Sequence, residues 1–90
     1  MPTHRQRHAI LVRRLTLVQE YRALHIERLD LHAQLATLRT TWITDPLSSA
    51  ERRTLVAELK ALSDRLRAIS LRSQGILLEH STLMHELAGA

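Results

Sequence analysis

Apolar residues recur along most of this chain at spacings that alternate between four and three residues. The pattern runs without a slip over residues 55–87, where eight of its ten positions are apolar. It also runs over residues 10–42, where Arg14 and Arg28 are polar exceptions. Such spacing is the heptad pattern of coiled coils, whose a and d positions face a neighbouring helix. It restricts the chain to long helices that pair along one seam.

One break separates the two patterned segments. Residues 40–45 are rich in β-branched threonine and isoleucine, which lower helix propensity. Pro46 cannot occupy a helix interior. Asp45 before Pro46 reads as a helix N-cap followed by the first helical position, and Ser48 with Glu51 offers a capping box two residues later. We expect a new helix to begin at one of these two places.

Capping residues also mark the outer ends of the two segments. Thr3 and Gln6 match a capping box at the start, and Gly89 suits the residue that follows a helix. Gly75 is a weak point of the second segment, because an internal glycine is about 1 kcal/mol less favourable than alanine. A kink or break near Gly75, which would give three helices, therefore stays open as an alternative.

The sequence thus predicts an all-α fold with a single domain over residues 1–90. A helix over about 3–41 and a helix over about 48–88 are joined by a turn over about 42–47. A short connection between long helices makes them antiparallel neighbours, so we expect a coiled-coil-like two-helix hairpin.

A single antiparallel register brings both seams together, with Leu17 near Ile76 and Leu38 near Leu55. The same register predicts three polar layers: Arg13 and Arg14 opposite Glu79 and His80, Arg28 beside Asp64 and Arg65, and Glu20 facing Ser73. Polar layers of this kind can fix the register of a coiled coil at some expense in stability.

The chain carries more apolar residues than one seam can bury. Most of the surplus falls at the open end of the hairpin, away from the turn: Leu11, Leu15, Val18, Leu71, Leu77, Leu78 and Met84. A contiguous exposed apolar patch is unusual for a monomer. We therefore expect a non-enzymatic protein–protein interaction module with an adaptor, chaperone-like or regulatory role. Its partner would be a second copy, forming a four-helix bundle, or a different helical protein.

Trp42 at the turn admits two interpretations. It can act as an apolar plug that closes the hairpin together with Ile43 and Leu47, or it can anchor a partner, since tryptophan is enriched at interaction hot spots.

The net charge of +4 is concentrated near the N-terminus, because the first 19 residues contain four arginines and no acidic residue. These arginines define an alternative function, nucleic-acid binding through phosphate contacts: Arg5, Arg7, Arg13 and Arg14. Only Tyr21 and Trp42 are aromatic, which gives little support to base stacking.

No motif for catalysis or cofactor binding occurs in the sequence. Cysteine is absent, and the two glycines cannot form a phosphate-binding loop. His4 and His8 share a helix face and lie near His85 in the expected register, but we interpret them as surface residues rather than metal ligands. We expect no enzyme activity, no metal and no cofactor.

The N-terminus does not resemble a signal peptide and no apolar run suits a membrane span, so we expect a cytoplasmic protein.

Overall fold

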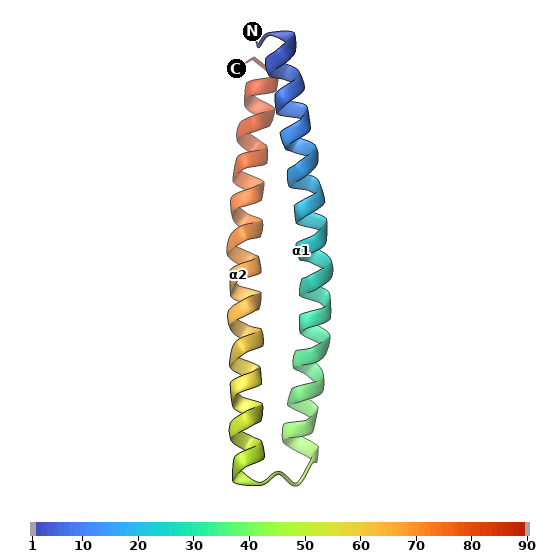
Figure 1. The fold of residues 1–90 in the computed structure, drawn as a ribbon, viewed down its shortest axis with the longest axis vertical. Helices are drawn as coiled ribbons and strands as arrows, with labels where there is room; N and C mark the ends of the chain where they lie inside the picture. The colour runs from blue at the N-terminus through green and yellow to red at the C-terminus, as the bar shows by residue number, and fades with distance from the viewer. Residues whose placement is uncertain (1, 90) are drawn as a thin grey trace.

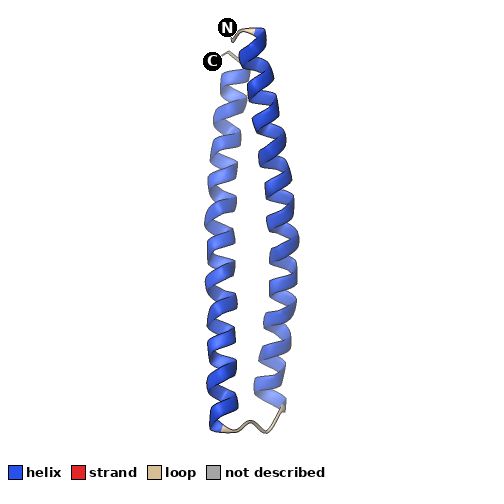
Figure 2. Cartoon of the chain, in the orientation of Figure 1, coloured by secondary structure: helices blue, strands red, loops and turns tan. Residues whose placement is uncertain are grey.

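The computed structural model of the chain describes residues 2–89 and consists of two long α-helices, α1 (His4–Thr44) and α2 (Ser49–Leu87). The helices run antiparallel, side by side, with the two termini at the same end (Figure 1). Within the described residues the chain is helical apart from short caps and one turn, with no strand (Figure 2). The predicted all-α helical hairpin is confirmed.

Both helices begin at the predicted capping boxes. The Thr3 hydroxyl accepts a hydrogen bond from the Gln6 backbone N–H at 3.1 Å, and the Gln6 side chain accepts one from the Thr3 N–H at 2.7 Å. Ser48 and Glu51 repeat this arrangement at the start of α2, at 3.2 and 3.3 Å. Each box satisfies two backbone donors that a helix N-terminus would otherwise leave without a partner.

Helix α1 extends three residues beyond its predicted end near residue 41. The threonine hydroxyls in this stretch donate to backbone carbonyls one turn earlier, including Thr44 to Thr40 at 2.8 Å, so these hydroxyls are satisfied within the helix. The helix stops at Asp45, whose extended backbone (φ −94°, ψ 140°) suits a residue that precedes proline. The interpretation of Asp45 as an N-cap of the second helix is therefore wrong, since it is the C-cap of α1.

Helix α2 is continuous through Gly75, so the alternative of three helices is wrong. Ser73 and Ile76, on either side of this glycine, are both buried against α1. That packing outweighs the modest helix propensity of one glycine. Gly89 has φ 76° and its N–H donates to the Glu86 carbonyl at 3.1 Å, which confirms it as the terminator of α2.

The core of the hairpin is a single row of side chains between the helices. Leu17 and Ile69 are completely inaccessible to solvent. Every buried residue occupies a position of the predicted seams: Ile10, Leu17, Leu31, Leu35, Leu55, Ile69, Ser73 and Ile76. The heptad pattern therefore identified the core correctly.

The molecule measures 65 × 15 × 15 Å and has a radius of gyration of 19.9 Å. A compact domain of this length would have a radius of about 12 Å. Its accessible surface is 6818 Å², whereas a compact folded protein of this mass exposes about 5,400 Å². Neither helix contains a stretch long and apolar enough to cross a membrane, within the residues described.

Candidate interaction surface

The two long sides of the hairpin differ because the helices are antiparallel. In that arrangement the e positions of one helix flank the e positions of the other, and the g positions flank the g positions. The b positions lie next to e and the c positions next to g. We call the side with the e and b positions the apolar face, and the side with the g and c positions the ladder face.

Three ion pairs join the helices on the ladder face at intervals of one heptad. They are Arg13 with Glu79, Glu20 with Arg72, and Glu27 with Arg65. Each arginine donates two hydrogen bonds to one carboxylate, for example from Arg65 Nε and Nη2 at 2.7 Å each. Bidentate pairs of this kind fix the relative position of the two helices.

The ladder confirms the predicted contact of Arg13 with Glu79, and Arg14 Nε donates to His80 Nε2 at 3.2 Å, also as predicted. In the other two predicted layers the side chains bond to residues that the register did not name as their partners. Glu20 pairs with Arg72, Glu27 pairs with Arg65, and Arg28 donates to His25 Nδ1 at 2.8 Å. The seam register was correct, but the long flanking side chains meet across g positions rather than across the seam.

The ladder lowers the pKa of its three glutamates and raises the pKa of its three arginines. Hydrogen bonds from the arginines lower the pKa of Glu20, Glu27 and Glu79 below the ordinary glutamate value, and partial desolvation opposes this shift. Because all six side chains are well solvated, these pairs contribute to register more than to stability.

The predicted surplus residues lie where the sequence placed them, at the open end and outside the seam. Leu78 is the most solvent-accessible of them, at 72%. We call this set the apolar stripe: Leu11, Leu15, Val18, Leu71, Leu77, Leu78 and Met84. Val18 and Met84 are half-buried at the edge of the seam, and the other five are exposed.

The exposed apolar residues avoid the ladder face completely. Among the described residues, none of the large exposed hydrophobic side chains occupies a g or c position. Between the helices at the open end of the apolar face is a groove of about 380 Å³, lined by Leu17, Val18, Tyr21, Arg22, Ile76, Leu77 and His80. The stripe therefore combines projecting leucines with a concave apolar groove.

Charge is divided between the same two faces. Over residues 4–44 and 49–87, the e and b positions hold no aspartate or glutamate, but they include Arg22, Arg39, Arg53, Lys60 and Arg67. The g and c positions hold seven of the nine acidic residues. The apolar face is thus also cationic. The separation of positive from negative charge follows from heptad position, because each face collects residues from the whole length of both helices.

Trp42 lies on the apolar face near the turn and is 44% exposed. The Arg52 guanidinium lies over its ring, 5.8 Å from the centroid. The predicted plug of Trp42 with Ile43 and Leu47 is wrong, because Ile43 is 80% exposed and Leu47 lines a groove on the ladder face. The role of Trp42 as a partner anchor stays a prediction.

The arginines of the N-terminal segment do not form one free basic patch. Arg13 is neutralised by Glu79, and Arg14 is hydrogen-bonded to His80. Arg5 and Arg7 are exposed.

Within the part of the chain that the structure describes, no cluster of three or more histidine and carboxylate side chains has an arrangement suited to a metal ion.

Comparisons of this chain with protein-family models, with curated proteins and with solved structures find no match.

Proposed function

We propose that this chain is a non-enzymatic protein–protein interaction module that binds through the apolar stripe at the open end of the hairpin. The observation that carries this proposal is the segregation of every large exposed apolar side chain away from the ladder face. Random exposure of leucines would place them on all sides, and single exposed leucines need no explanation. A one-sided stripe beside an apolar groove is typical of a docking surface for a helix.

The amount of exposed surface supports the same proposal. The hairpin exposes roughly 1,400 Å² more than a compact protein of its mass. A standard protein interface buries about 800 Å² on each partner. Covering the stripe would therefore bring the exposed area toward the ordinary range. A second copy in a helical bundle and a different helical protein are the two occupants that fit.

The nucleic-acid alternative has less support. Two of its four arginines already have partners within the hairpin, and a phosphate would have to compete with Glu79 for Arg13. A duplex would also leave the apolar stripe uncovered. Retention of generic duplex DNA on a filter at low salt, lost in an Arg5→Glu, Arg7→Glu variant, would favour it instead.

The proposal is tested by sedimentation equilibrium over a range of protein concentrations. Leu15→Glu and Leu78→Glu should each abolish association, because a buried carboxylate would face apolar surface, while the helical circular dichroism stays unchanged. Thr16→Glu is the matched control, since Thr16 is an exposed neighbour of Leu15 on the other side of the helix. A wild type that associates, together with stripe variants that associate equally well, would contradict the proposal.

A further inference from the structure

The ladder of ion pairs stops before it reaches the turn. One heptad beyond Glu27 and Arg65, the register places Gln34 opposite Glu58, so no cation faces that carboxylate. Glu58 makes no hydrogen bond or ion pair within the described residues, and Gln34 donates instead to Asp30 Oδ2 at 2.7 Å. The turn half of the ladder face therefore carries uncompensated negative charge.

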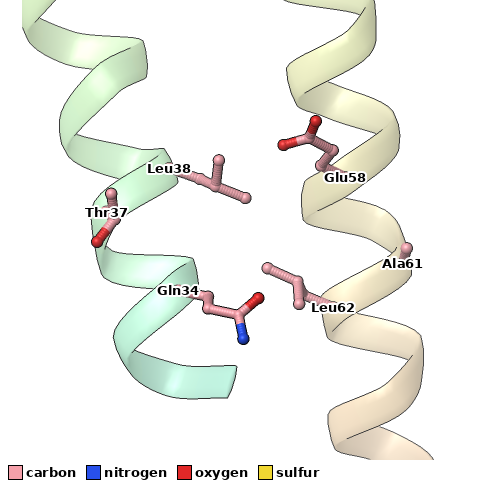
Figure 3. Close-up of a pocket in the computed structure, with 6 residues that line it drawn as sticks. All are labelled: Gln34, Thr37, Leu38, Glu58, Ala61 and Leu62. Carbon is pink, nitrogen blue, oxygen red and sulfur yellow. The ribbon is translucent and has the colours of Figure 1, made fainter. Parts of the chain in front are cut away.

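Two adjoining grooves open on this part of the ladder face, with volumes of about 420 and 430 Å³. They share Leu38 and Glu58, so they form one continuous depression, which we call the acidic groove. Its lining includes Thr37, Leu38, Glu51, Glu58, Ala61 and Leu62. Figure 3 shows Leu38 and Leu62 pointing toward each other from the two helices, with the Glu58 carboxylate above them.

The groove is open because the c positions beside it carry small side chains. Thr37 and Ala61 leave the seam leucines accessible from this side, whereas longer side chains would cover them. The result is a depression with an apolar floor and an acidic rim. A ligand that fits it must present projecting apolar groups flanked by positive charge.

The apolar stripe has these properties. Its leucines project from the surface, and Arg22 and Arg67 lie one helical turn from Val18 and Leu71. Neither arginine has an ion-pair partner among the described residues. We propose that the apolar stripe of one copy of this chain binds the acidic groove of a second copy. This inference rests on the proposed function, because it names the occupant of the stripe.

A face-to-face dimer is less favourable on electrostatic grounds. Two copies joined through their apolar faces would bring the cationic residues of one copy, including Arg22 and Arg67, against the same cationic set of the other, with no carboxylate at the e and b positions of either copy. Like charges in an interface oppose association. Stripe-to-groove contact instead pairs unneutralised arginines with Glu58.

The acidic groove lies on the ladder face near the turn. Five of the seven stripe residues lie on the apolar face at the open end, and Leu71 and Leu78 occupy outward-facing f positions at the same end. The two surfaces therefore cannot meet within one molecule. Each copy offers one of each, and the contact is therefore heterologous: it repeats from copy to copy unless a ring closes. Two interfaces of about 800 Å² each would cover about 1,600 Å² per copy, which is close to the excess surface of the isolated hairpin.

The test uses one variant for each surface and then a mixture. Leu15→Glu disables the stripe and leaves the groove intact. Ala61→Arg fills the groove with a cationic side chain and leaves the stripe intact. Ala57→Arg, an exposed position one turn away and outside the groove, is the matched control. Circular dichroism verifies that each variant stays helical, and sedimentation velocity measures its mass.

We expect the wild type and Ala57→Arg to form species larger than dimers as concentration rises, with dissociation at high salt. Each disabled variant alone should be monomeric, and an equimolar mixture of the two should form a one-to-one dimer and nothing larger. Glu58→Lys should weaken association about tenfold or more, and Arg22→Glu in the same chain should restore part of it.

Three results would overturn the inference. A wild type that remains monomeric would exclude a second copy as the occupant. Association of Ala61→Arg equal to that of the wild type, with loss in Leu15→Glu, would indicate face-to-face pairing, and the proposed function would then stand without the groove. Loss in neither variant would contradict both proposals.

Discussion

The guanidinium of Arg13 donates two hydrogen bonds to the carboxylate of Glu79, although the two residues are 66 positions apart in the chain. Together with the pairs one and two heptads further along, this contact fixes how far one helix can slide past the other. A shift by one residue would break all three pairs at once, because their partners are related by the same register.

The ladder should respond to charge reversal in a pairwise manner. Arg72→Glu opposes Glu20 with a like charge and should lower the melting temperature, and adding Glu20→Arg should recover most of the loss. Thermal unfolding followed by circular dichroism, at one fixed protein concentration, measures the effect. The effect should shrink in 1 M salt, where the screening length is about 3 Å. Lys60→Glu, at an exposed position without a partner, is the control, and an equal loss there would argue against a register role.

Acid should destabilise the hairpin. The pKa values of Glu20, Glu27 and Glu79 are lowered in the folded state, chiefly by hydrogen bonds from arginine. The stability from these pairs is therefore fully present above the ordinary glutamate pKa of about 4.3. It is lost as pH falls through the lower folded values, because the folded state then binds protons less readily than the unfolded state. Melting temperatures between pH 6 and pH 2 test this, and a triple Glu→Gln variant of the ladder should show a flatter profile.

Gly75→Ala should stabilise the protein by about 1 kcal/mol, since alanine is the better helix former. The new methyl group would find ordinary contact, with the nearest side-chain atom, Arg72 Nη1, at 4.0 Å. Chemical denaturation at fixed protein concentration gives the free energy of unfolding. A destabilised variant would mean that α2 needs the glycine for a deformation that the structure does not show.

Core truncation should separate buried from exposed leucines. Leu17→Ala removes a side chain with no accessible surface and should cost about 2–5 kcal/mol. Leu29→Ala, at an exposed position in the same helix, should change the free energy of unfolding by about 0.5 kcal/mol or less. Similar losses for the two variants, measured at concentrations where the chain is monomeric, would contradict the assignment of the seam.

The sequence alone determined the two helices, their capping boxes, the seam residues and the antiparallel register. Each of these depends on local spacing or on the pairing of apolar residues at regular intervals, and both properties can be determined from the sequence alone. The positions of the apolar stripe followed for the same reason, because a residue outside the seam of a two-helix hairpin has little else to cover it.

Tertiary structure decided the features that depend on competition between contacts. Packing of Ser73 and Ile76 kept α2 continuous through Gly75. Helix α1 continued to Thr44, where the threonine hydroxyl donates to a backbone carbonyl one turn earlier. The ion pair with Glu79 neutralised Arg13, which the sequence had assigned to a basic segment. Small side chains beside Leu38 left the acidic groove open. These outcomes depend on side-chain length and on which groups meet in space, so they are set only once the two helices have docked.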